Sequence, residues 1–426
     1  MSHPTLDQTQ VRGRWTERLG QLVKVLGRGA LATAMTMVVY GPARLVSRYL
    51  ARKREAGDVV WLDDLTFGSR RGPGHTPAPQ ERADLTPDRS VKSRKSRVIK
   101  HDGYPEPDYP FAYRRPPLSG NVANGLDEPS ARRPRKVYHT MDYSTPWGGM
   151  ELYLHATNTA NAVSRIVRGI WDNRDRRGPL APVRRTVDDP AGMTATLVDT
   201  MREVGAALVG VAELAEHHLY EGAKRRHRYA VSLAVTMDRE AMLTAPEEPS
   251  RLAVLDAYVD VGQLAIDLAK RIRALGWEAE AHTNNDFDAS DVVHVPVAID
   301  AGLGQLGKHG SLITVEHGSN VRLATVLTDL PLVPSAPVDI GVDDFCASCQ
   351  VCVTNCPPHA IFDTKQLVRG EVRWYVDFDT CTPYFSANGG CGICIEVCPW
   401  SEEGRGSFIR DKMLARRTTT HPRLGD

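Results

Sequence analysis

The spacing of apolar positions becomes regular after about residue 190. It predicts, in order, a helix, a short buried strand, a second strand and a long helix, at residues 193–204, 207–212, 229–235 and 252–275. Gly276 stands where glycine commonly ends a helix, and a further strand is predicted through Ala279. Helices that alternate with short apolar strands predict an α/β sheet domain, in which ligands usually bind at loops beyond the strand ends.

The N-terminal region is predicted to be a helix over residues 10–55. One face is basic, and the other is apolar at Leu19, Leu22, Val23 and Leu26. Such a helix either packs on the main body of the protein or binds an anionic membrane surface or a partner. The most apolar early run, residues 30–40, is too short to span a membrane, which takes roughly 20 residues.

Residues 68–135 are dense in Pro, Gly and Arg, which disfavour long helices and central strands. We interpret this stretch as extended chain that wraps over a core. Interleaved aromatic side chains would dock it there, namely Tyr104, Tyr109, Phe111 and Tyr113. A disordered linker is the alternative interpretation.

Charge and leader sequences restrict the class of protein. The 426-residue chain has a formal net charge of +1, which gives no reason to expect a nucleic-acid partner. The first thirty residues lack the apolar core of a secretory signal. Neither Arg70-Arg71 nor Arg132-Arg133 precedes the apolar stretch of a twin-arginine leader, so we predict a cytoplasmic protein.

All eight cysteines lie between Cys346 and Cys398. Such clustering, without a secretory leader, predicts metal binding in a reducing compartment rather than disulfides. The first motif is C-x2-C-x2-C-x3-C-P and the second is C-x9-C-x2-C-x3-C-P, starting at Cys346 and Cys381. This spacing is typical of a ferredoxin-like module with two [4Fe-4S] clusters. Zinc sites, the alternative, need neither the third close cysteine nor the proline.

The two motifs are expected to exchange a ligand, because in two-cluster ferredoxins the last cysteine of a motif binds the other cluster. Cluster 1 would then be held by Cys346, Cys349, Cys352 and Cys398, and cluster 2 by Cys356, Cys381, Cys391 and Cys394. Such clusters transfer single electrons. Since roughly 340 residues precede the module, we expect the upstream domain to hold a cofactor that accepts those electrons.

A glycine-rich loop occupies residues 301–310. Gly302, Gly304 and Gly307 fit G-x-G-x-x-G, but no clear βαβ unit with a ribose-binding acid surrounds them. Nucleotide binding is therefore the minor alternative here. We expect the glycines to let the backbone approach another ligand.

Several stretches resemble the corrinoid-dependent reductive dehalogenases. They are Ala301-Gly-Leu-Gly, residues 320–332, and Trp374 to Tyr384 leading to residues 390–400, and the resemblance covers about residues 190–402. A related family, the epoxyqueuosine reductases, also ends its second motif in Cys-Pro-Trp but has a much longer insert within it. Only nine residues, including a Pro-Tyr-Phe spacer, separate Cys381 from Cys391 here.

The resemblance implies an α/β (α+β), nitroreductase-like core that binds base-off cobalamin beside the two-cluster module. The sequence contains no Asp-x-His-x-x-Gly motif for a lower cobalt ligand. Candidate corrin contacts are Asn285, Gly302, Gly304, Lys308, His309, Gly310, Leu312, His359 and Trp400. We divide the chain into a helical N-terminal region, a wrap, a cobalamin-binding catalytic domain, a ferredoxin-like domain and a basic tail, at residues 1–67, 68–189, 190–340, 341–405 and 406–426.

The family's reaction replaces a carbon–halogen bond with carbon–hydrogen, using two electrons and one proton. The resemblance implies that Tyr258 donates the proton and that Arg322 stabilises the phenolate. By spacing alone, Tyr258 would be a core residue and Arg322 an ordinary strand-edge residue. Asn284 matches a position near the tyrosine hydroxyl, or is a turn residue, and Lys308 is a second cation there or a corrin contact.

The sequence therefore predicts an oxidoreductase, a reductive dehalogenase that acts on a small organohalide with cob(I)alamin. It would need an external low-potential donor of the ferredoxin or flavodoxin type. The N-terminal helix could add weak membrane-surface association. One alternative is an epoxyqueuosine-reductase-like enzyme with the same cofactors. The other is an electron-transfer protein whose upstream domain only docks partners.

Overall fold

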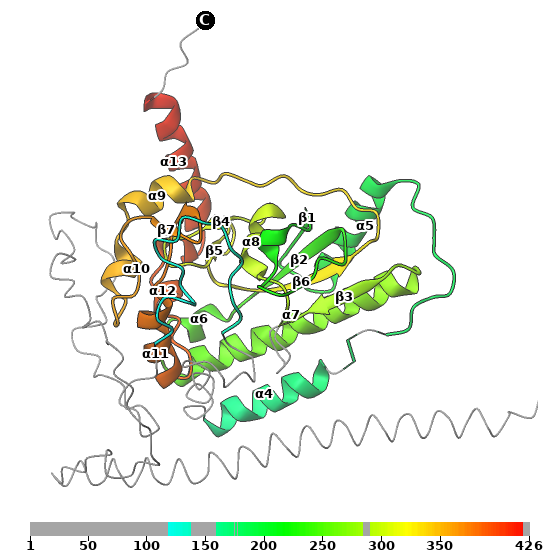
Figure 1. Cartoon of the computed structure of the whole chain (residues 1–426), viewed down its shortest axis with the longest axis horizontal. Coiled ribbons are helices and arrows are strands. Elements are labelled where there is room, and N and C mark those ends of the chain that lie inside the picture. Colours follow the sequence, from blue (N-terminus) through cyan, green and yellow to red (C-terminus); the bar gives the residue numbers. More distant parts are fainter. Residues whose placement is uncertain (1–117, 138–158, 174, 177, 284–289, 421–426) are drawn as a thin grey trace, which may run out of the picture. The chain divides into compact units, whose positions relative to one another are not determined.

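The computed structural model describes residues 118–137, 159–173, 175–176, 178–283 and 290–420 (Figure 1). These residues belong to one compact unit of the chain. The predicted helix over residues 10–55 and the docking aromatics between Tyr104 and Tyr113 lie outside the described residues. None of the helices in the described ranges combines the length and apolarity needed to cross a membrane.

A four-stranded sheet forms the centre of the upstream domain, in the order β1-β2-β6-β3. Its strands are β1 (Leu208–Glu213), β2 (Tyr229–Thr236), β3 (Ala279–His282) and β6 (Val321–Thr328). Every neighbouring pair is antiparallel, which makes the arrangement α+β, whereas α/β sheets are mostly parallel. The apolar runs do not distinguish the two, because any strand buried on both faces is apolar throughout.

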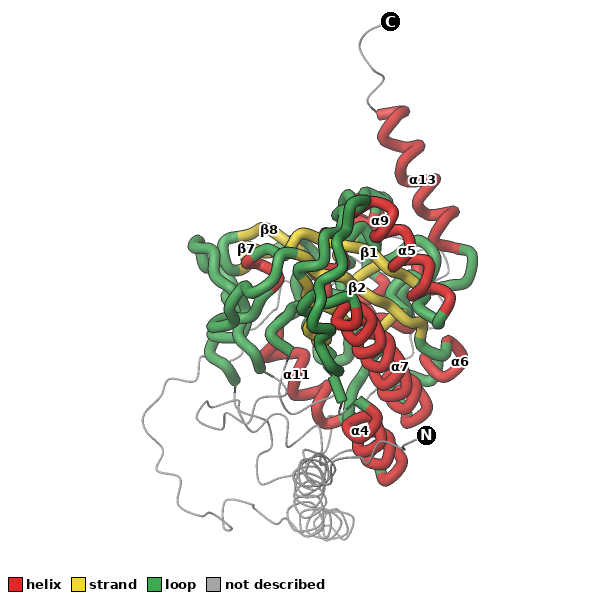
Figure 2. Tube along the Cα trace, turned by 90° about the vertical axis from the view of Figure 1, so that its right-hand side faces the viewer, coloured by secondary structure: helices red, strands yellow, loops and turns green. Residues whose placement is uncertain are grey.

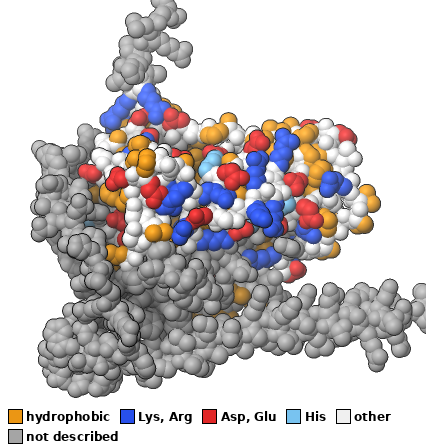
Figure 3. All heavy atoms as spheres, viewed as in Figure 1, with side chains coloured by type: hydrophobic (Ala, Val, Ile, Leu, Met, Phe, Trp, Pro, Cys, Tyr) orange, Lys and Arg blue, Asp and Glu red, His pale blue; other side chains and the backbone are white. Residues whose placement is uncertain are grey.

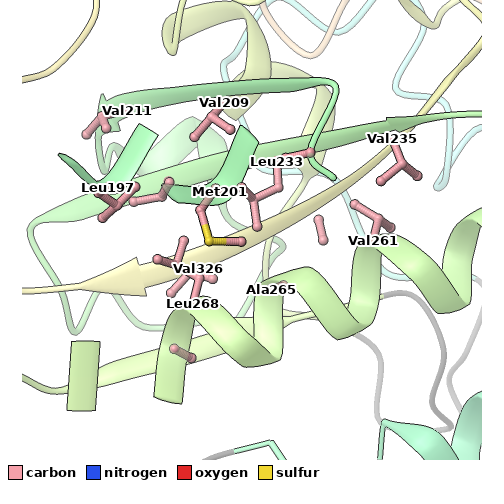
Figure 4. Close-up of a cluster of buried hydrophobic side chains, with 14 of the residues drawn as sticks. Leu197, Met201, Val209, Val211, Leu233, Val235, Val261, Ala265, Leu268 and Val326 are labelled. Carbon is pink, nitrogen blue, oxygen red and sulfur yellow. The ribbon is translucent and has the colours of Figure 1, made fainter. Parts of the chain in front are cut away.

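Helices cover both faces of this sheet (Figures 1 and 2). Alternate residues of β2, such as Val231 and Leu233, enter a core shared with α5 (Pro190–Glu203) and α7 (Glu248–Ala274), part of which Figure 4 shows. The intervening alanines of β2 pack instead in the two clusters that include α8 (His294–Asp300). α4 (Ala160–Asp172) packs on α7.

The elements predicted after residue 190 are confirmed, with ends that differ by a few residues. α7 ends as expected: Gly276 has a φ of 81°, and its N–H donates to the carbonyl of Arg273. Gly210 in β1 has another reason to be glycine. A Cβ there would lie 2.2 Å from the carbonyl oxygen of Ala301, so the end of α8 could not approach the sheet.

Short elements complete the upstream domain. They are η3 (Glu216–His218), α6 (Arg239–Met242), β4 (Gln305–Leu306) and β5 (Leu312–Ile313). β4 and β5 pair as a small antiparallel hairpin, and the loop between them contains Lys308, His309 and Gly310. This hairpin brings the glycine-rich loop up to the cysteine-bearing module.

The cysteine-bearing module is built from short helices and one β-hairpin. Its elements are α9 (Val342–Ser348), α10 (Val351–Thr354), β7 (Gln366–Val368), β8 (Glu371–Arg373), α11 (Phe378–Ala387), α12 (Ile393–Glu396) and η4 (Pro399–Ser401). The region predicted as a basic tail is helical over most of its length, as α13 (Arg405–Thr420). Ile409 and Met413 of α13 pack in the same core as Cys346 and Cys398.

Residues 118–137, the first described stretch of the region 68–189, contain no helix or strand and join the module to the upstream domain. Asn124 donates to the carboxylate of Asp377 in the module. Arg133 donates to Glu216, and Lys136 donates to Asp291, both in the upstream domain. On the face shown in Figure 3, basic and acidic side chains are interspersed over the described surface.

Candidate redox site

A cavity of about 650 Å³ lies between the upstream domain and the module. One wall is formed by α7, the start of β6 and part of α4, and the other by residues around Cys356, Cys381, Cys391 and Cys394. Among the described residues that line it there is no Asp or Glu, whereas Arg165, Arg251, Arg322 and Arg373 all contribute. The cavity is therefore suited to anionic or polarisable groups rather than cations.

Tyr258 and Arg322 meet in this cavity. The guanidinium carbon of Arg322 lies 5.2 Å from the centre of the Tyr258 ring. Arg322 precedes Ala324 and Val326 on the face of β6 that packs on α7, and Tyr258 precedes Val261 on the facing side of α7. The interface between β6 and α7 is thus apolar except for Arg322 and Tyr258, which lie at its edge and line the cavity.

Arg322 is held in place with one of its nitrogens unused. Its Nη1 donates to the carbonyl of Val321 at 3.2 Å, while its Nε is buried without a hydrogen-bond partner among the described residues. A buried donor without a partner is costly, so a ligand that accepts this hydrogen bond would be favoured.

His309 lines the same cavity but offers no free ring nitrogen. Its Nδ1 accepts the N–H of Ser311 at 3.2 Å, so its Nε2 carries the proton and donates to Ser319 at 2.9 Å. Burial lowers the pKa of His309 to about 4, which keeps the ring neutral at pH 7. Both ring nitrogens of His309 are therefore engaged within the protein.

The other residues predicted as corrin contacts lie in different surroundings. Gly310 lines the cavity. Gly304 and Gly302 instead allow close contact between backbone segments. A Cβ on Gly304 would lie 2.1 Å from the carbonyl oxygen of Ile313, and a Cβ on Gly302 would lie 2.6 Å from that of Ala336. Leu312 is buried in the core against α8, and His359 is exposed on a turn with a φ of 54°.

Lys308 lies by the cysteines rather than by Tyr258. It is buried, and its Nζ donates to the carbonyl oxygen of Cys349 at 3.0 Å. Trp400 is also buried on that side of the module, against Phe345. Asn284 and Asn285 lie outside the described residues, so their predicted roles stay predictions.

The structure interleaves the cysteines of the two motifs. Cys398 of the second motif shares a hydrophobic core with Cys346 of the first. Cys381 of the second motif packs against the cluster of side chains that contains Cys356 of the first. The eight cysteines form no disulfide.

The cysteine groups fit metal clusters rather than free thiols. Burial raises the pKa of the Cys346 thiol to about 11 and that of Cys398 to about 12, so these thiols would stay protonated without a positive metal centre. The indole Nε1 of Trp400, in the same core as Cys398, is buried without a hydrogen-bond partner among the described residues. Both features match sites built for iron–sulfur clusters.

Arg251 is a site residue that sequence reasoning missed. It lies two helical turns before Tyr258 on α7, and its Nη2 donates to the carbonyl of Asn388 in the nine-residue spacer of the second motif. A Cβ on Gly389 would collide with it. The signal available in the sequence was the seven-residue spacing from Tyr258, which places both side chains on one helix face.

A second cavity of about 880 Å³ adjoins the first and shares Leu306, Arg373 and Tyr375 with it. Its wall includes His217 and Asp300, and Asp300 also accepts from the buried His218 at 2.8 Å. The three side chains are close enough to hold a metal ion. However, the Nδ1 of His218 accepts the N–H of Ala215, so its Nε2 holds a proton that a metal would have to displace.

The cysteine-bearing module matches a known protein family. Residues 345–401 match the family described as a 4Fe-4S dicluster domain. The module with its two buried cysteine groups is therefore that of a two-cluster iron–sulfur protein.

Several proteins that are similar to this chain over a longer stretch than the module are named reductive dehalogenases. The tetrachloroethene reductive dehalogenase of Sulfurospirillum multivorans is 34% identical over 177 residues, which are 39% of this chain and 34% of that protein. That of Desulfitobacterium hafniense is 35% identical over 178 residues, 39% of this chain and 31% of that protein. The chain spans about a third of the length of these curated relatives.

A solved structure agrees with these relatives. The catabolic reductive dehalogenase NpRdhA superposes with a TM-score of 0.54 and 26% identity, covering 61% of this chain and 41% of that one. Over part of its length, this chain is therefore similar to reductive dehalogenases. The epoxyqueuosine reductase of a Synechococcus species is similar at 28% identity over 254 residues, covering 51% of this chain and 78% of that protein.

Proposed function

We propose that this protein is a reductive dehalogenase, an oxidoreductase that cleaves a carbon–halogen bond of a small organohalide. The observation that carries the proposal is the pairing of Arg322 with Tyr258 in a cavity that extends to the second group of cysteines. A proton donor and an electron donor would thus face one enclosed volume. The similarity to named dehalogenases, 34% identity over 177 residues in one of them, supports the same conclusion.

The cavity also suits the corrinoid that such an enzyme needs. One similar solved structure is described as suggesting a mechanism for B12-dependent dehalogenation. In this chain, the loop from His309 to Ser311, with Val376 and Tyr375 opposite, would hold the cofactor. Cobalamin, when bound, supplies a cobalt centre that delivers electrons to the substrate. Since both nitrogens of His309 are engaged, the protein offers no histidine from this loop as a lower ligand.

Tyr258 is proposed to hold the proton that replaces the halogen, at its phenol oxygen. Per turnover, the substrate gains two electrons and this proton, and halide leaves. The guanidinium of Arg322 over the ring stabilises the phenolate that remains. The remaining arginines of the cavity lower the cost of releasing an anion there.

The cysteine groups define the route of the electrons. Cluster 2 would lie in the wall of the cavity, because its cysteines line it, and cluster 1 would lie behind it, under α13. An external low-potential donor of the ferredoxin or flavodoxin type would reduce cluster 1 first. A nitroreductase-like core, a cytoplasmic location and weak association of the N-terminal helix with a membrane surface are further parts of this proposal.

The decisive experiment measures halide release by the full chain after anaerobic reconstitution with iron, sulfide and cobalamin. Turnover should require a low-potential reductant. Tyr258→Phe should lower the rate about 100-fold or more, the usual contribution of a general acid, with cofactor content unchanged. Tyr384→Phe is the matched control, because Tyr384 lines the same cavity from α11, and it should keep activity.

Two outcomes would decide against the proposal. Loss of an epoxide-bearing nucleoside, without halide release from chlorinated, brominated or fluorinated compounds, would favour an epoxyqueuosine-reductase-like enzyme. Reconstituted protein that takes up iron but no corrinoid would favour a simple electron-transfer protein. Equal rates for Tyr258→Phe and Tyr384→Phe would refute only the role of Tyr258.

A further inference from the structure

Lys308 carries a charge in a place where charge is costly. Its exposed fraction is 1%, and it lies in the loop between β4 and β5. An ammonium group taken out of water loses several kcal/mol of hydration unless a negative group compensates it. The lysine therefore needs a partner of opposite charge nearby.

Lys308 contacts the first cysteine group. Its Nζ donates to the carbonyl oxygen of Cys349 at 3.0 Å. Its Nζ also lies 4.8 Å from the centre of the Trp374 ring, whose π-electrons favour a cation. The side chain is thus held in one position beside cluster 1.

No carboxylate in the described part of the chain lies within ion-pair distance of this ammonium group. The carboxylate of Asp343, near Trp374, pairs instead with the Nζ of Lys365 at 2.6 Å and accepts a hydrogen bond from the indole N–H of Trp374. Burial lowers the pKa of Lys308, and the cysteines Cys352, Cys346 and Cys349 oppose this shift more strongly than Asp363 does. A [4Fe-4S] cluster with thiolate ligands is itself negative, so it would compensate the lysine.

We propose that Lys308 is a positioning residue for electron transfer, whose buried ammonium group raises the reduction potential of cluster 1. Reduction adds one negative charge to the cluster, and a fixed cation in a low-dielectric site stabilises that charge. This role differs from the expected contact with Tyr258 or the corrin. It depends on the two-cluster module alone and not on the substrate of the enzyme.

The test is a redox titration of the full chain with both clusters assembled, followed by electron paramagnetic resonance, without substrate. Lys308→Met should lower the potential of cluster 1 and leave that of cluster 2 unchanged. At the potential where the wild-type cluster 1 is half reduced, the ratio of reduced to oxidised cluster should fall about tenfold, which is 59 mV for a one-electron couple. Lys308→Arg should restore the wild-type potential.

Lys365→Met is the matched control. Lys365 lies over the same Trp374 ring at 5.6 Å, but its side chain is 36% exposed and paired with Asp343, so water screens its charge. Equal potentials in Lys308→Met and wild type, or equal shifts in both methionine variants, would overturn the proposal. Lys308→Gln keeps a hydrogen-bond donor without the charge, and a wild-type potential in this variant would also overturn it. If neither neutral variant assembles cluster 1, Lys308 is structural and the proposal is wrong.

Discussion

One carboxylate oxygen of Asp300 accepts hydrogen bonds from the side chains of His217 and His218, each at 2.8 Å. The hydrogen bond that His217 donates to Asp300 raises the pKa of His217, and the bonds from His217 and His218 hold the pKa of Asp300 well below its usual range. The folded state thus favours protonated His217 and ionised Asp300. Asp300 contributes stability above the ordinary pKa of an aspartate, and the contribution of His217 is complete below the ordinary pKa of a histidine.

Asp300→Asn should therefore destabilise the protein in a pH-dependent manner. The loss of stability should be largest between about pH 4 and 6.5, and it should shrink as pH rises through the raised pKa of His217. Urea denaturation midpoints measured from pH 4 to 9 test this. Asp267→Asn is the control, since Asp267 pairs with Arg271 rather than with a histidine, and its effect should be flat above about pH 5. Parallel curves for the two variants would contradict the assignment.

At the scale of elements, the end of α7 matters because this helix carries Arg251 and Tyr258. Gly276, just beyond the helix, has a φ of 81°, and a Cβ there would lie 2.4 Å from the carbonyl oxygen of Val183. Two separate features therefore require glycine at this position: a left-handed backbone and close contact with a neighbouring segment. The two effects can be separated experimentally.

Gly222→Ala supplies the comparison for Gly276→Ala, since Gly222 has a φ of 83° and a Cβ there would meet no atom within 4 Å. Gly222→Ala should cost about 1–2 kcal/mol, the usual penalty of a left-handed conformation for alanine. Gly276→Ala should cost more than this, because the added carbon also collides with Val183. Urea denaturation followed by circular dichroism measures both changes. Equal losses of stability in the two variants would show that the contact with Val183 is relaxed without cost.

At the scale of the whole molecule, the cysteines of the two sequence motifs interleave in space. Cys398 belongs to the second motif but packs in one core with Cys346, from the first motif. Cys352 and Cys394, one from each motif, lie in another shared cluster of buried side chains. The two sites therefore depend on the fold of the entire module.

Cys398→Ser should consequently impair the same cluster as Cys346→Ser, although the two cysteines belong to different motifs. Cys394→Ser, from the same motif as Cys398, should impair the other cluster. Iron content and electron paramagnetic resonance of the reduced proteins distinguish these results. Matching spectra for Cys398→Ser and Cys394→Ser, different from that of Cys346→Ser, would mean that each motif holds its own cluster.

Much of this molecule was predictable from sequence because the relevant interactions are local or follow a fixed spacing. The strands around Val231 and Val211, the helix that ends before Gly276 and the cysteine motifs all depend on neighbouring residues. The resemblance to a family singled out Tyr258 and Arg322, whereas helical spacing alone described Tyr258 as a core residue. For the corrin-loop residues, chain position indicated a region but could not indicate which side chains face it.

The helices and strands after residue 190 and the two-cluster motif follow from the chain alone, since periodicity and ligand spacing are properties of the sequence. The antiparallel sheet, the position of Arg322 over Tyr258 and that of Lys308 beside the cysteines arise only from tertiary packing. Antiparallel and parallel strands buried on both faces have the same apolar pattern. Contacts between residues far apart in the chain arise from packing, which no local pattern records.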